Sequence, residues 1–160
     1  MPVFRENKAG HFFNISSIGG YVGGYAGWGA YCAGKFAVAG LTEALHAETN
    51  AMGIKSTVVY PGAFRTDFLS KTSLKTPSDL IGQYKEARTS QEFYQNELSG
   101  NQQGSPEKFA EAIIEISRSS NPPLHLFLGR DTYNATLKKM DIVRTDLEKW
   151  KELSFSTSFE

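Results

Sequence analysis

Short apolar runs that suit β-strands alternate in this chain with segments of helical periodicity. The runs cover residues 11–16, 54–59 and 124–128, and helical patterns follow at 30–50, from 105 and after Gly129. Consecutive strands separated by helices pair in parallel, because a parallel crossover needs about a dozen residues or more. The alternation predicts an α/β fold: a three-stranded parallel sheet with flanking helices. No boundary divides residues 1–160 into two domains.

The helical segments differ in how clearly they are marked. Ser105, Pro106 and Glu107 form a good helix start, since they supply an N-cap, a proline at the first position and an early acidic residue. Two apolar patterns at helical spacing accompany the other helices. The first comprises Ala30, Ala33, Ala37, Leu41, Ala44 and Leu45, and the second comprises Tyr133, Leu137, Met140, Leu147 and Trp150. A stripe like the second normally faces the core, and we expect it to do so here.

Composition excludes several classes of function. Lys+Arg and Asp+Glu number 17 each, and no basic block marks a surface for nucleic acid or anionic membranes. No run approaches the ~20 apolar residues of a membrane span. Cys32 is the only cysteine, and the three histidines have no partners at ligand spacing, so no metal site is expected. We expect a cytoplasmic protein without a nucleic-acid or membrane partner.

The loop from Ser17 to Gly29 is the first candidate site, because six of its thirteen residues are glycine. Such a loop adopts unusual backbone angles or approaches a ligand closely. Aromatic residues Tyr21, Tyr25 and Trp28 in this loop suit either a hydrophobic substrate pocket or ordinary core packing. The polar stretch 70–104 has no strong stripe, and we interpret it as a substrate lid.

Tyr31 and Lys35 follow this loop, four residues apart on the expected helix, so their side chains project from one face. A cation about 4 Å from a phenol, at an effective dielectric constant of about 20, favours the phenolate by about 4 kcal/mol. Desolvation opposes part of this effect. We therefore expect Lys35 to lower the pKa of Tyr31 toward neutral pH, where general acid–base catalysis is most effective.

Three spaced motifs agree in their order along the chain. They are Asn14-Ile15-Ser16-Ser17-Ile18-Gly19-Gly20, then Tyr31-x-x-x-Lys35, then Val58-Val59-Tyr60-Pro61-Gly62 with Thr66. In this combination the chain closely resembles the short-chain dehydrogenase/reductase family, from the family's fifth strand onward. The resemblance implies a Rossmann-like sheet and interconversion of a small-molecule carbonyl and alcohol by hydride transfer with NAD or NADP.

The resemblance also implies roles for individual residues. Ser17 would hydrogen-bond the substrate carbonyl oxygen, Tyr31 would donate or accept the proton, and Lys35 would hold the nicotinamide ribose. Pro61, Gly62, Phe64 and Thr66 would position the nicotinamide, so that the chain contacts only that end of the cofactor. The helix 30–50, which forms part of the family's dimer interface, would support a homo-oligomer.

The family's glycine-rich pyrophosphate turn and its Asn-Ala-Gly stretch have no counterpart here. Residues Met1–Gly10 resemble the end of the helix that precedes the family's fifth strand. We therefore expect that the chain is a truncated polypeptide and that Met1 corresponds to an internal methionine of the complete one. Two functions are therefore open: an NAD(P)-dependent oxidoreductase of this family, and a non-catalytic fragment that acts, if at all, as an interaction module with a related dehydrogenase. Binding of a nicotinamide cofactor discriminates between them.

Overall fold

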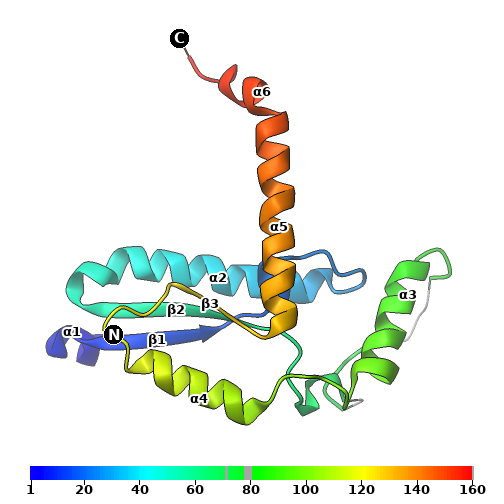
Figure 1. Cartoon of the computed structure of the whole chain (residues 1–160), viewed down its shortest axis with the longest axis horizontal. Helices are drawn as coiled ribbons and strands as arrows, with labels where there is room; N and C mark the ends of the chain where they lie inside the picture. Colours follow the sequence, from blue (N-terminus) through cyan, green and yellow to red (C-terminus); the bar gives the residue numbers. More distant parts are fainter. Residues whose placement is uncertain (71, 78–80, 160) are drawn as a thin grey trace.

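A computed structural model of the chain describes residues 1–70, 72–77 and 81–159. Its centre is a parallel sheet of β1 (Gly10–Ile15), β2 (Ile54–Pro61) and β3 (His125–Leu128), in the order β1-β2-β3. Helix α2 (Gly29–Thr49) covers one face and α4 (Pro106–Ser117) the other (Figure 1). The predicted three-stranded, Rossmann-like parallel sheet with flanking helices is confirmed.

The remaining elements surround this sheet. Helix α1 (Pro2–Asn7) precedes β1, α3 (Lys85–Glu92) runs into a π-helical turn (Phe93–Leu98), and α5 (Arg130–Lys149) is followed by α6 (Lys151–Phe155). Short 3₁₀ turns occupy Ile18–Gly20, Asn50–Met52 and Asp67–Leu69. In the described part of the chain no helix is long and apolar enough to cross a membrane.

Strand β2 forms the core of the sheet because it lies between the other two strands. Ile54, Val58 and Val59 are fully buried and Tyr60 is nearly so. This continuous burial suits a central parallel strand covered on both faces. Tyr21 leaves the glycine-rich loop and packs edge-on against Tyr60, at 5.7 Å between ring centroids, so this aromatic residue belongs to the core.

Helix α2 begins and ends close to the predicted residues, but the face that it buries is not the alanine and leucine pattern. Cys32, Ala39, Thr42 and Thr49 are buried, whereas Leu41 is 67% exposed. The inward threonines are tolerated because each hydroxyl donates to the carbonyl four residues earlier, and Thr42 also accepts from the Asn14 side chain at 3.0 Å. Of the predicted pattern, Ala30, Ala33, Ala37, Leu41 and Ala44 are exposed.

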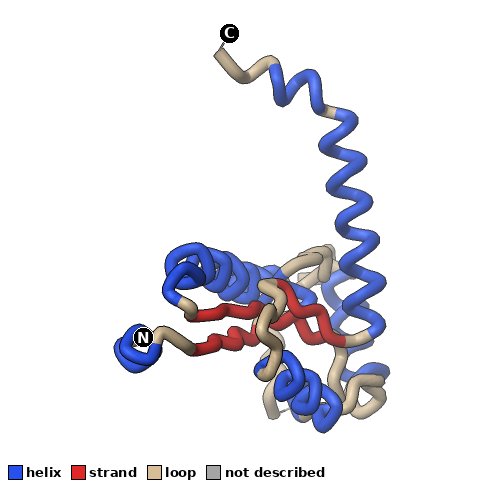
Figure 2. Tube along the Cα trace, turned by 60° about the vertical axis from the view of Figure 1, so that its left-hand side comes forward, coloured by secondary structure: helices blue, strands red, loops and turns tan. Residues whose placement is uncertain are grey.

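The stripe on α5 does not face the core, so that expectation is wrong. Tyr133, Leu137, Met140, Leu147 and Trp150 are between 45% and 64% exposed. Figure 2 shows the reason: the helix leaves the sheet after its first turns and projects from the body of the molecule. Only Thr132 and Thr136 of α5 are buried. Helix α4, by contrast, turns Phe109, Ala112, Ile113 and Ile116 inward and is capped by the Ser105 hydroxyl as predicted.

Candidate active site

A cavity of about 1290 Å³ opens at the carboxyl ends of the three parallel strands, the usual ligand position in open α/β sheets. Ile15, Pro61 and Leu128, which end β1, β2 and β3, all line it. The cavity also collects the residues that sequence analysis selected. These are Ser17, Tyr31, Lys35, Pro61, Gly62, Phe64 and Thr66.

Ser17 and Tyr31 meet around Gly19. A Cβ on this glycine would lie 3.3 Å from Tyr31 Cε1 and 3.6 Å from Ser17 Oγ, so the glycine leaves room for the tyrosine ring beside the serine. Ser17 is buried and its hydroxyl accepts a hydrogen bond from the Gly19 amide at 3.1 Å. That bond orients the hydroxyl oxygen and leaves its proton for another partner.

Gly20 lets the loop reach α2. A Cβ there would lie 2.7 Å from the Lys35 carbonyl carbon and oxygen, which leaves space only for glycine. The Ser16 hydroxyl donates to the same Lys35 carbonyl at 2.7 Å. Ser16 therefore ties the end of β1 to α2, while its neighbour Ser17 turns toward the cavity.

Lys35 makes its hydrogen bond to β1 and lies over the ring of the phenol. Its Nζ donates to the Ile15 carbonyl at 3.1 Å and lies 5.8 Å from the centroid of the Tyr31 ring. Two of the three ammonium protons are left for other acceptors. This position suits a residue that binds hydroxyl oxygens of a ligand in the cavity.

Burial raises the pKa of the Tyr31 phenol above its usual 10, while hydrogen bonding with the Ser17 side chain acts in the opposite direction. The expected lowering by Lys35 is therefore wrong for this structure. The reason is geometric: Trp28 and Phe68 pack on Tyr31 at 5.6 Å between ring centroids and keep water away, whereas the Lys35 charge is directed to Ile15.

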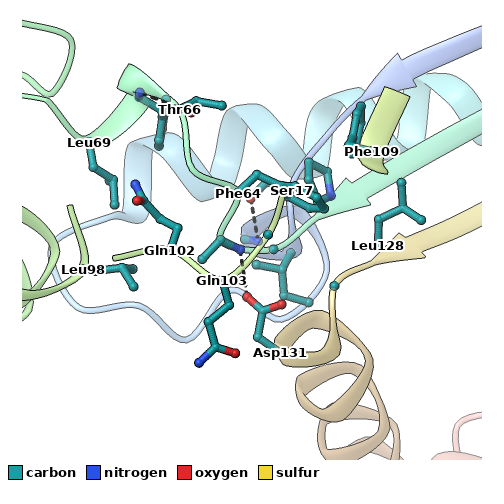
Figure 3. A pocket seen from close by; sticks show the side chains of 18 of the residues that line it. Ser17, Phe64, Thr66, Leu69, Leu98, Gln102, Gln103, Phe109, Leu128 and Asp131 are labelled. Atoms are coloured by element: carbon teal, nitrogen blue, oxygen red, sulfur yellow. Dashed lines mark hydrogen bonds between the residues drawn. The ribbon is translucent and has the colours of Figure 1, made fainter. Parts of the chain in front are cut away.

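Residues of the Pro61–Thr66 segment also line the cavity, and Asp131 at the start of α5 fixes this segment. The Asp131 carboxylate accepts a hydrogen bond from the Ala63 amide at 2.8 Å (Figure 3). Asp131 and Thr132 also pack so tightly on Gly62 that no Cβ would fit there. The Thr66 hydroxyl caps the turn Asp67–Leu69, and Phe64 packs on Phe109 at 5.1 Å between ring centroids.

Aromatic and apolar side chains close the other side of the cavity. Trp28 packs edge-on against Tyr94 at 4.7 Å between ring centroids, and Tyr25 also lines the cavity. Two of the three loop aromatics thus belong to the pocket, and only Tyr21 belongs to the core. The predicted lid, residues 70–104, contributes Phe93, Tyr94, Leu98 and residues 101–104 to the wall. Residues 71 and 78–80 of that stretch lie outside the described residues.

Sequence analysis missed Asp131 and Gln102, which both line the cavity. Asp131 could have been found, since it follows the third strand closely and the carboxyl ends of parallel strands share one edge. Gln102 carries no such signal. The part of the chain that the structure describes holds no cluster of three metal-ligating side chains. His11 and His125 instead hydrogen-bond Thr57 and Tyr60, at 2.8 and 3.3 Å.

Comparison with known proteins agrees with this geometry. The family model described as short chain dehydrogenase matches residues 1–77. An oxidoreductase of Botryotinia fuckeliana is 32% identical over 99% of the chain and 57% of its own length. The crystal structure of a short-chain dehydrogenase from Streptomyces avermitilis superposes with a TM-score of 0.85 and 34% identity, over 99% of this chain and 56% of that one.

A short-chain dehydrogenase from Burkholderia cenocepacia, solved in complex with NADP, has a TM-score of 0.54 and 16% identity, over 92% of this chain and 49% of that one. At that identity it shows a shared fold only. The chain spans about half the length of the proteins described here.

Proposed function

This chain belongs to the short-chain dehydrogenase/reductase family, and from that premise we propose that it supplies the catalytic side chains of an NAD(P)-dependent oxidoreductase that interconverts a carbonyl and an alcohol. The observation that carries the proposal is that Ser17, Tyr31, Lys35 and residues of the Pro61–Thr66 segment line one and the same cavity. The cytoplasmic location expected from the sequence stays a prediction.

The cavity fits the nicotinamide end of a dinucleotide. Lys35 has two unused ammonium protons for ribose hydroxyls, and Thr66 presents a hydroxyl near the backbone of the Pro61–Phe64 segment. Gly62 keeps this backbone close to the wall, where Asp131 immobilises it. When bound, the cofactor supplies or accepts a hydride at the substrate carbon. The Burkholderia protein, which shares the fold, was solved with NADP, and our proposal makes no choice between NAD and NADP.

The proton chemistry belongs to the chain itself. In reduction, Ser17 donates its free proton in a hydrogen bond to the substrate carbonyl oxygen and Tyr31 transfers its phenol proton to that oxygen. The raised pKa of Tyr31 keeps the phenol protonated at neutral pH, so the tyrosine is ready to act as the acid. In oxidation the same phenol must accept a proton after ionising, which its burial disfavours.

The apolar wall around Trp28, Tyr94 and Leu98 favours a carbonyl compound with an apolar body. The exposed face of α2 supports the predicted homo-oligomer, because Leu41 and the neighbouring alanines lie outward on the helix that the family uses for dimer contacts. An interaction module that docks on a related dehydrogenase would use the same face, and it is the alternative function.

Titration of ¹⁵N-labelled chain with nicotinamide mononucleotide tests the proposal and separates the two functions. We expect the backbone amide signals of Ser17, Gly62 and Thr66 to shift at millimolar ligand, because these residues line the cavity. Signals from the amino end of the strands, such as that of Met52 just before β2, serve as the control. An unchanged spectrum would favour the interaction module.

A further inference from the structure

Gln102 is an unusual residue in the cavity wall. Its side chain is 1% exposed, and within the described residues neither its amide oxygen nor its amide nitrogen has a hydrogen-bond partner. Buried polar atoms are almost always paired, because an unpaired donor or acceptor loses its hydrogen bonds to water without replacement. A buried amide without hydrogen-bond partners in a cavity wall therefore indicates that a ligand bound in the cavity supplies the missing partners.

The backbone of Gln102 is firmly held, which fixes where the amide can lie. The Arg65 guanidinium donates to the Gln102 carbonyl twice, from Nε at 3.2 Å and from Nη2 at 3.0 Å. Two residues further on, the Gly104 amide donates to the Ala63 carbonyl and the Gly104 carbonyl accepts from the Arg65 amide, both at 2.9 Å. Gln102 is thereby attached to the Pro61–Thr66 segment.

In the view of Figure 3 the amide end of the Gln102 side chain points toward Leu69, and Leu98 is drawn on the other side of Gln102. Neither leucine side chain can donate or accept a hydrogen bond. The amide thus presents an N–H donor and a carbonyl acceptor side by side, and a second carboxamide is the group that complements both at once.

We propose that Gln102 is a ligand-recognition residue whose amide pairs with a carboxamide of the molecule bound in this cavity. The amide nitrogen donates to the ligand carbonyl, and the amide oxygen accepts from the ligand N–H. The inference rests on the proposed function, because it takes the cavity to be the ligand site. Contact requires the side chains that cover the amide to move aside, since both amide atoms are buried in this structure.

Two ligands could carry this carboxamide: the nicotinamide ring of the cofactor, or an amide-bearing substrate. The side-chain ¹⁵N signals of Gln102, assigned by their loss in Gln102→Met, distinguish them. Nicotinamide mononucleotide and hexanamide are the two probes. A shift with the first alone assigns Gln102 to the cofactor, a shift with the second alone assigns it to the substrate, and a shift with both shows one amide subsite that accepts either.

The affinity of the responding probe should fall about ten-fold in Gln102→Met, the effect of losing hydrogen bonds at a desolvated site. Gln83→Met, which changes an exposed glutamine in the same way, should leave the affinity unchanged. Shifts at Ser17 and Gly62 without a shift at the Gln102 amide would overturn this inference and leave the proposed function standing. No shift anywhere in the cavity would overturn both.

Thermal unfolding provides a second, independent readout. Methionine has a similar length without polar atoms, so Gln102→Met should raise the melting temperature of the unliganded chain by a few degrees, because it removes two unpaired buried atoms. Gln83→Met should not. A lower melting temperature for Gln102→Met would show that the amide has a structural partner, and the inference would be wrong.

Discussion

Lys35 Nζ lies 5.8 Å from the centroid of the Tyr31 ring, one helical turn away on α2, and its hydrogen bond goes to the carbonyl of Ile15 at the end of β1. The pair thus shares one cavity, and the ammonium group lies over the phenol ring while its hydrogen bond goes to β1. Tyr31 is left with a pKa raised by burial, and Lys35 is left with protons for a ligand. The two residues have separate tasks in the proposed reaction.

Tyr31→Phe should abolish most turnover, because it removes the transferable proton while keeping the ring. We expect a loss of about 10²- to 10⁴-fold, the usual contribution of a general acid. The assay is NADH- or NADPH-dependent carbonyl reduction. It uses a full-length polypeptide, in which residues 1–160 are joined to the remaining part that the relatives have and this chain lacks. The free energy of unfolding should change by less than about 1 kcal/mol. Near-normal turnover would eliminate Tyr31 as the acid.

The pH dependence of reduction should reflect the same phenol. Because the pKa of Tyr31 is raised, the protonated form persists beyond pH 10, and the rate should decline only as the pH passes that raised value. The oxidation rate should increase over the same range, since it requires the ionised form. A reduction rate that is already lost between pH 7 and 9 would contradict this assignment.

Asp131→Ala should weaken binding at the nicotinamide end. The substitution leaves the Ala63 amide without its acceptor and frees the Gly62 backbone from the side chain that packs on it. We expect the affinity for nicotinamide mononucleotide to fall about ten-fold, measured by the shifts of the Gly62 and Thr66 amides. Asp131→Asn is the matched control, because its side-chain oxygen can still accept from Ala63 and should restore most of the affinity.

Alkaline pH should unfold the chain through its buried tyrosines. Burial raises the pKa of Tyr25 and of Tyr60 to about 12 each. An unfolded tyrosine ionises near pH 10, so this contribution to stability is complete below pH 10 and is lost as the pH rises from 10 to 12. The free energy of unfolding should fall by up to about 1.4 kcal/mol per pH unit in that window for the buried Tyr60, and by less for the half-buried Tyr25, whose charge solvent screens.

Denaturant titrations between pH 8 and pH 12 measure this loss. Tyr60→Phe should reduce the slope above pH 10, because it removes one of the phenols whose pKa burial raises. It should also cost some stability at neutral pH, since Tyr60 hydrogen-bonds His125 at 3.3 Å. An unchanged slope in this variant would show that Tyr60 does not titrate on unfolding.

Residues 1–160 alone should bind NADH and NADPH weakly and should associate. Their accessible surface is 11308 Å², whereas a compact monomer of 17.7 kDa exposes roughly 8,000 Å². The family resemblance assigns the chain only the nicotinamide end of the cofactor, so the reactants would not be held in place. Calorimetric titration with light scattering is the measurement. Micromolar binding by a monodisperse monomer would contradict the expectation.

Leu41→Lys tests whether the outward face of α2 is the surface that associates. Leu41 is 67% exposed in the single chain, so a lysine there should cost little folding stability. A charge in the centre of an apolar interface should shift the light-scattering mass toward the monomer. Glu43→Lys, on an exposed position of the same helix, is the control for the change in charge. Equal masses for Leu41→Lys and the parent chain would exclude this face.

The elements of the fold could be predicted from the sequence because they depend on local patterns. The apolar runs placed β1, β2 and β3 to within about two residues, and Ser105 with Pro106 marked the start of α4. The position of the cavity followed as well, since parallel strands bring their carboxyl ends to one edge. The site residues expected from the resemblance all line it for this reason; these are Ser17, Tyr31, Lys35, Pro61, Gly62, Phe64 and Thr66.

Contacts between distant segments decided the rest. Periodicity shows that α2 and α5 have an apolar face, but only the neighbouring elements determine which face is covered. Asn14 engages Thr42, so the alanine face of α2 turns outward, and α5 leaves the sheet before its stripe meets a partner. Asp131 meets Ala63 across 68 residues, and Arg65 reaches Gln102 across 37. Local sequence patterns do not predict contacts between residues so far apart in the chain. The pKa of Tyr31 likewise depended on tertiary packing, because Trp28 and Phe68 desolvate the phenol while Ile15 holds the charge of Lys35.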